Sequence, residues 1–267
     1  MPRQIIDLTA TIEEGMVQNA PFHPRAPLLW TNQTHNVTQW YQEHLWSGDL
    51  PPLFDGLPPE AGQHGQGHGQ QSEQVLFGTH MGTHIDAPLH FDGRPEAGDA
   101  TTIPVEICIG DAILLDLRSE VGDDWGHVIT SEDLDAAEAR SGDTVRPGDI
   151  VILHTGHAAA NAYGPDASTA NYAPIHPGLG YHAPAWFLER KVVLIGVDTA
   201  NLDTNQVLSA HVNFLLRPWI GKEPVYIIEN LVRLEDISRS RFEFIGLPLP
   251  IKDGSGSPIR AVAILPD

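Results

Sequence analysis

The chain of 267 residues contains a single cysteine, Cys108, and this scarcity excludes an internal disulfide bond. It also excludes a CxxC pair for zinc binding or redox chemistry. Cys108 lies in the apolar run VEICIG, where no neighbouring group would activate its thiol. We therefore expect a small, buried, unreactive side chain rather than a nucleophile.

Basic residues are also scarce, because 15 lysines and arginines stand against 35 aspartates and glutamates, which gives a net charge of −20. Such a surface repels phosphate backbones and anionic lipid headgroups. Neither nucleic acid nor a membrane surface is therefore an expected partner, and solubility is the simplest consequence of the acidity. The expected partner is a small-molecule substrate.

Long hydrophobic runs are missing. No stretch approaches the roughly 18 apolar residues of a membrane span, and the N-terminal MPRQIIDLTATIEEGM lacks the apolar core of a signal peptide. A cytoplasmic location is the default expectation. Hydrophobic residues still make up 41% of the chain, which is enough for a packed globular core.

The 25 glycines and 22 prolines indicate many turns between short elements. Helices are expected at 131–140, where Ser131 or Thr130 would be the N-cap, and at 183–190. Short strands outnumber them and are expected at residues 5–8, 75–80, 110–117, 148–156, 191–199, 224–231, 244–251 and 259–265. This order predicts an α/β protein with a mixed, barrel-like sheet, and residues 1–267 read as one domain.

Residues 17–75 form a variable, loop-rich segment of unusual composition, rich in Pro, Gln, Gly, His and Trp. Its part GQHGQGHGQQ, residues 62–71, is low in complexity, and we expect it to be mobile. The segment also carries aromatic residues that we expect near the mouth of the active site, because long loops in compact domains are often lids or binding loops. Trp46 is the candidate among them for substrate binding.

The motif HMGTHIDAPLH brings four candidate ligands, His80, His84, Asp86 and His90, within eleven residues. All four have the same parity, so an extended strand would turn them to one face. Burying these groups without partners would be costly, which makes packing alone a poor explanation for the cluster. The pattern predicts that the first three converge on one metal ion and that His90 lies beside it.

A helix would also align His80 with His84, as in zinc proteases, but Asp86 would then point away. The general-base glutamate of the HExxH motif is missing, and Gly82 and Pro88 oppose a helix. A strand or a tight loop is therefore the preferred prediction. In either conformation Gly82 would allow a close approach of the backbone to the site.

Two imidazoles and a carboxylate form a donor set that suits Zn²⁺, Mn²⁺ or Fe²⁺. Three protein ligands leave positions for water, whose pKa a bound divalent ion lowers towards about 7. This chemistry would make hydroxide available at neutral pH. The predicted cofactor is a divalent metal ion, Zn²⁺ or Mn²⁺.

The segment GTHMGTHIDAPLHF resembles the signature HxGTHxDxPxH of the cyclase-type metal-dependent hydrolases, a family that includes bacterial kynurenine formamidase and isatin hydrolase. Other family landmarks follow in order along the chain: IIDLT, GDIVILHTG, IGVDTANLD, SAH, IIENL and GSPIRAVA. The resemblance implies a swivelling β/β/α fold, a homodimer or homotetramer, and one or two metal ions. Residues 17–75 match least, because they are longer than this pattern leads us to expect.

The resemblance also implies roles for individual residues. His80, His84 and Asp86 match metal ligands of the signature, and His90 matches the catalytic histidine that transfers protons. His211, in SAH, matches a more distant histidine of the same site.

The resemblance further implies a carboxylate or an amide after this histidine, and two glutamates compete for that position. The usual spacing from His211 reaches Glu223 in the turn GKEP, whereas the sequence context favours Glu229 in IIENL. We predict Glu229, because a charge buried in an apolar run needs a partner such as a metal ion. Glu223 would be solvated in its turn.

Three further residues have two possible roles each. Asp198 and Asp203 end a predicted strand in GVDTANLD, where they either face the site or cap the following turn. Arg260, in SPIRAVA, either binds a substrate carboxylate through two hydrogen bonds or forms a structural ion pair. The candidate substrate-binding residues are therefore Trp46, Asp198 and Arg260.

The leading functional hypothesis is an amidohydrolase that acts on a carbon–nitrogen bond other than a peptide bond, in a formamide or in a cyclic amide such as isatin. Metal-activated water would attack the carbonyl group, and His90 would pass the proton to the leaving nitrogen. A ring-closing polyketide cyclase is the alternative, and the aromatic residues of 17–75 would suit its planar substrate. A non-catalytic metal-binding module is a third possibility, against which the additional His90 argues.

Overall fold

The computed structural model describes residues 3–12, 16, 28–32, 72–94, 96–162, 172–204 and 207–266. By its contacts the chain divides into two compact units, residues 1–25 with 78–267, and residues 26–77. Most of the segment 17–75, including Trp46 and the tract 62–71, lies outside the described residues. The predicted role of this segment and the single-domain organisation therefore stay predictions.

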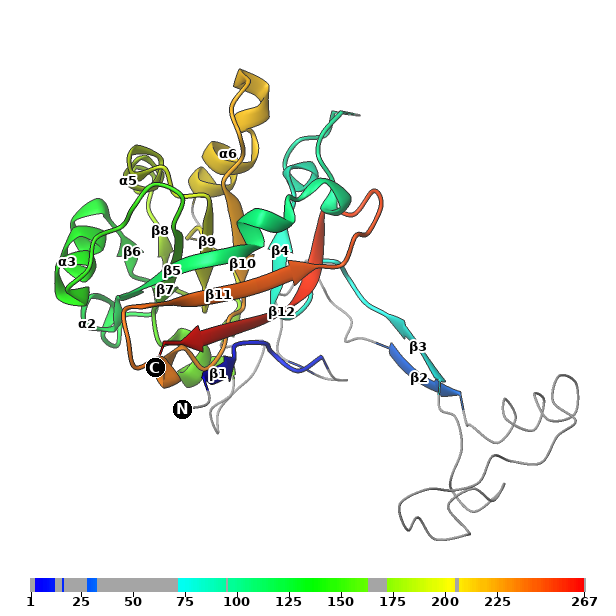
Figure 1. The fold of residues 1–267 in the computed structure, drawn as a ribbon, viewed down its shortest axis with the longest axis horizontal. Coiled ribbons are helices and arrows are strands. Elements are labelled where there is room, and N and C mark those ends of the chain that lie inside the picture. Colours follow the sequence, from blue (N-terminus) through cyan, green and yellow to red (C-terminus); the bar gives the residue numbers. More distant parts are fainter. Residues whose placement is uncertain are drawn as a thin grey trace, which may run out of the picture. The chain divides into compact units, whose positions relative to one another are not determined.

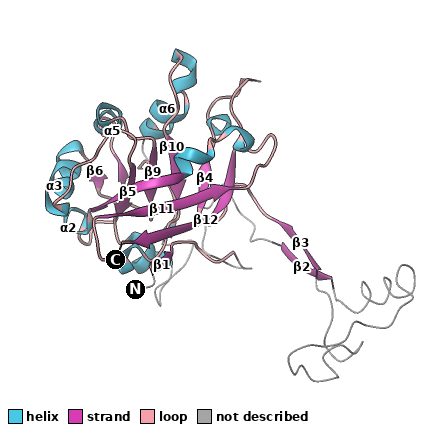
Figure 2. Cartoon of the chain, viewed as in Figure 1, coloured by secondary structure: helices cyan, strands magenta, loops and turns pink. Residues whose placement is uncertain are grey.

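The second unit contributes one antiparallel pair of strands, β2 (Leu28–Asn32) and β3 (Ser72–Leu76). The strands of the first unit, drawn in Figures 1 and 2, are β1 (Gln4–Asp7), β4 (His84–Asp86), β5 (Ile109–Asp116), β6 (Val128–Ile129), β7 (Ile150–His154), β8 (Gly178–Leu179), β9 (Leu194–Val197), β10 (Tyr226–Glu229), β11 (Arg241–Pro248) and β12 (Gly256–Leu265).

The α-helices of the described residues are short. They are α2 (Arg118–Val121), α3 (Ser131–Ser141), α5 (Pro184–Arg190) and α6 (Ser209–Leu215). Shorter 3-10 turns cover Pro88–His90, Ala100–Thr102, Val105–Cys108, Arg217–Ile220 and Leu234–Asp236, and a π-turn covers Ala158–Ala162. None of these helices is long and apolar enough to cross a membrane.

Eight strands of the first unit form one sheet in the order β1-β12-β11-β5-β7-β9-β10-β4, and β12 also pairs with β4. This extra pairing closes the sheet on itself, with β1 added at its margin. The neighbours β5, β7, β9 and β10 run parallel, whereas β4, β11 and β12 pair antiparallel. The predicted mixed, barrel-like α/β fold is confirmed.

The parallel strands are apolar on both faces because two cores flank them. On β5, Ala112 and Leu114 belong to a core inside the closed sheet, to which β1, β4, β11 and β12 also contribute. Ile113 and Leu115 alternate with them and pack in the outer core, against residues of α3, α5 and α6. The twofold periodicity of a strand therefore divides one apolar run between the two layers.

Several local predictions are confirmed. Helix α3 begins after Thr130, whose side chain accepts a hydrogen bond from the backbone of Asp133 while Asp133 binds back in a capping box. Cys108 is fully buried, as expected, and burial raises the pKa of its thiol to about 12. Helix α6 has no counterpart in the predicted elements, whereas β4 lies in the motif for which a strand or a tight loop was expected.

Candidate active site and metal centre

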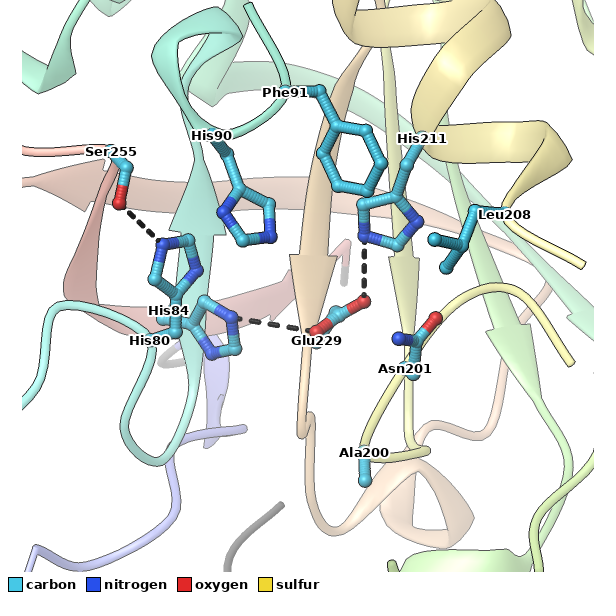
Figure 3. Close-up of a pocket in the computed structure, with 10 residues that line it drawn as sticks. All are labelled: His80, His84, His90, Phe91, Ala200, Asn201, Leu208, His211, Glu229 and Ser255. Carbon is cyan, nitrogen blue, oxygen red and sulfur yellow. Dashed lines mark hydrogen bonds and ion pairs between the residues drawn. The ribbon is translucent and has the colours of Figure 1, made fainter. Parts of the chain in front are cut away.

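A pocket of about 370 Å³ lies where β9 and β10 end, beside β4 and the first turn of α6. Figure 3 shows the side chains that line it, which come from sequence segments far apart: His80, His84, His90, Phe91, Ala200, Asn201, Leu208, His211, Glu229 and Ser255. Because parallel strands end at one edge of a sheet, their last residues and the following loops meet here.

Strand pairing explains how His84 and Glu229 meet. They are directly opposite in the antiparallel pair β4–β10, and His84 Nε2 lies 3.4 Å from Glu229 Oε2. Asp86, two residues along β4, has its Oδ1 3.4 Å from the same nitrogen. The Nδ1 atom of His84 donates to the carbonyl oxygen of Gly82 at 2.8 Å, so its Nε2 is the nitrogen turned to the carboxylates.

His80 reaches the cluster from a turn and not from a strand, so the predicted common strand face is wrong for this residue. The strand contains only His84–Asp86, and the chain before it turns at Gly82, which has a positive φ of 63°. The Nδ1 atom of His80 still lies 2.7 Å from Asp86 Oδ1, and its Nε2 lies 2.8 Å from Ser255 Oγ. The tight-loop alternative therefore applies to the first half of the motif.

His211 comes from the first turn of α6, where a buried carboxylate fixes its ring. Asp203 accepts hydrogen bonds from the backbone nitrogens of Ala210 and His211, and from His211 Nδ1 at 2.7 Å. The other ring nitrogen, Nε2, lies 3.4 Å from both Asp86 Oδ2 and Glu229 Oε1. Asp203 thus caps the helix and also orients a histidine of the site, so both of its possible roles apply.

Asp86 supplies the observation that tests the site for a metal ion. Its side chain is fully buried, yet neither carboxylate oxygen accepts a hydrogen bond of acceptable geometry, despite the short contact with His80. One oxygen faces His80 and His84, and the other faces His211. A buried carboxylate without hydrogen bonds among imidazole nitrogens is stabilised by a cation. The donor atoms of the motif lie within 4.8 Å of one another, so they fit a divalent metal ion.

The charges of the cluster point in the same direction. Burial lowers the pKa of His84, but Asp86 and Glu229 outweigh it and raise the pKa to about 10. Burial raises the pKa of Glu229, but His211 and His84 outweigh it and lower the pKa to about 2. The two carboxylates thus create a negative potential that holds protons on the histidines. The same potential would hold a metal cation in their place.

His90 follows Pro88 in a short 3-10 turn and stacks on His80, with ring centroids 4.0 Å apart. His90 lines the pocket and is exposed, but the protein around it still partly desolvates its ring. This desolvation, together with the nearby charges of His80 and His211, lowers the pKa of His90 to about 4 despite the opposing effect of Asp86. His90 therefore combines contact with the cluster and access to a bound molecule.

Two of the three predicted substrate-binding residues do not line this pocket. Asp198 is buried, and its carboxylate accepts hydrogen bonds from the backbone and hydroxyl of Thr155 and from the backbone of Gly156. Arg260 lies on β12 with 75% of its side chain exposed and pairs with Asp7. Arg260 therefore forms the structural ion pair considered from the sequence, whereas Asp198 binds the loop after β7 and does not cap the turn after its own strand. Trp46 lies outside the described residues.

Other pocket residues escaped the sequence reasoning. Phe91 and Leu208 form apolar walls, and Ser255 binds His80 from the loop before β12. Asn201 follows β9 in TANLD, a segment in which only the aspartates drew attention. A polar loop residue directly after a parallel strand was the available signal for Asn201.

Comparisons with known proteins agree with this geometry. Residues 6–204 match the model of the Cyclase family, described as "Putative cyclase". The kynurenine formamidase of Bordetella petrii is 31% identical over 192 residues, covering 71% of this chain and 78% of that protein. The kynurenine formamidase of Bacillus cereus is 28% identical over 221 residues, covering 81% and 89%.

Solved structures show the same fold. An isatin hydrolase bound to the product analogue thioisatinate superposes with a TM-score of 0.72 at 21% identity, over 99% of this chain and 93% of that one. Isatin hydrolase A from Labrenzia aggregata gives a TM-score of 0.73 at 20% identity, over 99% and 94%. With a family model matched over most of its length, this chain belongs to the cyclase family.

Proposed function

We propose that this protein is a metal-dependent amidohydrolase that cleaves the carbon–nitrogen bond of a formamide or of a cyclic amide such as isatin. The single observation that carries the proposal is the buried carboxylate of Asp86, which lacks hydrogen bonds and lies among histidines that line a pocket. The names of the relatives, kynurenine formamidase and isatin hydrolase, supply the reaction class.

Five side chains would hold the metal ion, and the Zn²⁺ or Mn²⁺ expected from the sequence fits their nitrogen and carboxylate donors. They are His80, His84, Asp86, His211 and Glu229. When bound there, a divalent ion supplies Lewis acidity, which polarises a carbonyl group and lowers the pKa of water. The hydrogen bonds from His84 to Gly82 and from His211 to Asp203 keep the facing nitrogens directed at this position.

His90 is the proposed acid–base residue. It lines the pocket and stacks on His80, so it can reach both the attacking water and the leaving nitrogen of a bound amide. It would accept a proton as the carbon–oxygen bond forms. It would then donate that proton to the nitrogen as the carbon–nitrogen bond breaks, which leaves a carboxylic acid and an amine.

The pocket volume favours hydrolysis of a small amide over the alternative of polyketide cyclisation. A cavity of about 370 Å³ is near the lower end of the range of ligand sites and suits a substrate of one or two rings. The apolar walls at Phe91 and Leu208 suit the aromatic ring of a substrate.

The homodimer or homotetramer expected from the family resemblance remains part of the proposal.

The test combines metal analysis with product analysis. Protein purified without a histidine tag is assayed for bound metals by mass spectrometry and then incubated with N-formylkynurenine and with isatin. We expect a divalent metal ion and, as products, isatin that has gained one water molecule or the free amine of N-formylkynurenine together with formate. Protein that binds no such metal, or that turns over neither amide when loaded with Zn²⁺ or Mn²⁺, would contradict the proposal.

A further inference from the structure

The loop after β9 brings one uncommitted hydrogen-bond donor into the pocket. Asn201 lines the pocket together with Glu229 and His211, and Figure 3 shows its amide nitrogen on the side that faces Glu229. The metal cluster proposed above does not use this side chain. Among the described residues, its Nδ2 atom donates to no acceptor, although the neighbouring loop atoms are extensively bonded.

Hydrogen bonds of the loop determine which way this amide points. The backbone nitrogen of Asp203 donates to Asn201 Oδ1 at 2.8 Å, so the oxygen is engaged on the loop side. A flipped amide would bring an N–H group against this backbone N–H, which is unfavourable. The oxygen is thereby fixed, and the two hydrogens of Nδ2 are left for the pocket.

The backbone of Asn201 is also held in place. Thr199 Oγ1 donates to the carbonyl oxygen of Asn201 at 2.7 Å, and the next backbone nitrogen, that of Leu202, donates to Glu229 Oε1 at 2.8 Å. The residue that follows Asn201 is therefore hydrogen-bonded to Glu229, a carboxylate of the cluster. A side chain held in this way loses little conformational entropy when a ligand accepts its hydrogen bond.

We infer that Asn201 is a substrate-binding residue, whose Nδ2 donates a hydrogen bond to a carbonyl oxygen of the amide substrate. This inference rests on the proposed function, because it requires an acceptor-bearing amide in the pocket. An aromatic amide would lie against Phe91 and Leu208, with one carbonyl oxygen turned to Asn201. Open-chain formamides and cyclic amides both have a carbonyl oxygen that accepts hydrogen bonds, so the contact with Asn201 would serve either class of substrate.

Two substitutions separate this role from a merely structural one. Asn201→Ala removes both the donor and the acceptor. Asn201→Asp keeps the size of the side chain and an oxygen for the N–H of Asp203, but it turns an acceptor with negative charge into the pocket. If Asn201 only stabilised its loop, the aspartate variant would be close to wild type and the alanine variant would be the weaker one.

We expect the opposite order. Asn201→Ala should lower kcat/KM for isatin or N-formylkynurenine about 10-fold, and Asn201→Asp should lower it about 100-fold or more. Binding of isatin, measured by calorimetry on the metal-free chain, should weaken in the same order. Asn213→Ala is the matched control, because this exposed asparagine of α6 donates to Ser209 without lining the pocket and should change neither quantity.

Metal content and the thermal unfolding midpoint are measured for all three variants. An aspartate variant with near-wild-type binding would overturn the inference, and so would an alanine variant equal to wild type. If the wild-type chain binds isatin but hydrolyses neither amide, the proposed function fails alone, and the order of the binding constants still decides the role of Asn201. A wild-type chain that neither binds isatin nor hydrolyses either amide when loaded with Zn²⁺ or Mn²⁺ overturns both.

Discussion

Among the described residues, two sets of buried carboxylates have different surroundings. At the pocket, Glu229 and the adjacent Asp86 face histidine nitrogens, and no lysine or arginine is among the described residues that line it. A histidine can lose its proton and leave a nitrogen lone pair, whereas a guanidinium group cannot. Carboxylates paired with histidines can therefore exchange protons for a metal ion.

Outside the pocket, buried carboxylates have permanent hydrogen-bond donors. Asp149 accepts hydrogen bonds from the guanidinium of Arg241 and from the backbone of Arg146. Asp198 accepts three from Thr155 and Gly156. These groups stabilise the ends of strands and have no remaining oxygen for a cation. Burial alone therefore does not identify a functional carboxylate, whereas the type of partner does.

The largest effect should come from Asp86→Asn. The amide cannot neutralise a divalent cation, so we expect loss of bound metal and a fall in activity of about 10³-fold or more, roughly 4 kcal/mol of transition-state stabilisation. Asp149→Asn weakens the buried ion pair with Arg241, just before β7 and outside the pocket. This variant should lower the unfolding midpoint and leave the metal content unchanged. Metal analysis and thermal unfolding of both variants test the comparison, and equal metal loss in the two would break it.

His90→Ala should have the next largest effect. Loss of acid–base assistance should lower activity by roughly 10²-fold or more while the metal content stays nearly intact. The reason is that His90 borders the cluster through His80 and reaches into the pocket. Steady-state kinetics and metal analysis decide between the roles. If metal and activity fall together, His90 is a ligand, a role that its closeness to Asp86 and His211 would allow.

Glu229→Gln should lower metal affinity or turnover by at least about 10-fold. Its carboxylate faces His84 and His211 and accepts a hydrogen bond from the backbone of Leu202, whereas the exposed Glu223 lies in the turn before β10. Glu223→Gln is therefore the matched control and should change little. Metal titration of the two variants measures the difference, and the reverse order would reassign the ligand.

The motif, the alternation of strands and helices, and the capped helix α3 could be predicted because each depends on residues close in sequence. The choice between Glu223 and Glu229 also followed from local context, since an apolar run implies burial. The structure brings Glu229 to the cluster through its pairing with His84. That pairing is a long-range contact that the sequence alone did not define.

Other features depended on contacts that a local pattern does not contain. Parity suggested a common strand for His80, His84 and Asp86. However, Gly82, with its positive φ, turns the chain just before β4, so the strand does not extend back to His80. The seven-residue helix α6 depends on Asp203, which caps it from the preceding loop and not from the usual N-cap position. Asn201 could not be assigned to the site from the sequence, because its place in the pocket depends on β9 and β10 ending side by side.

The smallest effect should come from Arg260→Ala, which removes the partner of an exposed carboxylate on the outside of the sheet. Burial raises the pKa of Asp7, but hydrogen bonds from Arg260 and Thr9 outweigh it and lower the pKa below its usual value. A lowered pKa means that the pair stabilises the fold above the unfolded pKa of about 3.9, and that this stabilisation disappears as the pH falls through the folded value. We expect kcat/KM and metal content within about 2-fold of wild type, because an exposed ion pair contributes little. The small difference in urea midpoint between variant and wild type should be measurable at pH 7 and should shrink as the pH falls below about 3.9. A KM that rises strongly for a carboxylate-bearing substrate such as N-formylkynurenine would instead return Arg260 to the substrate site.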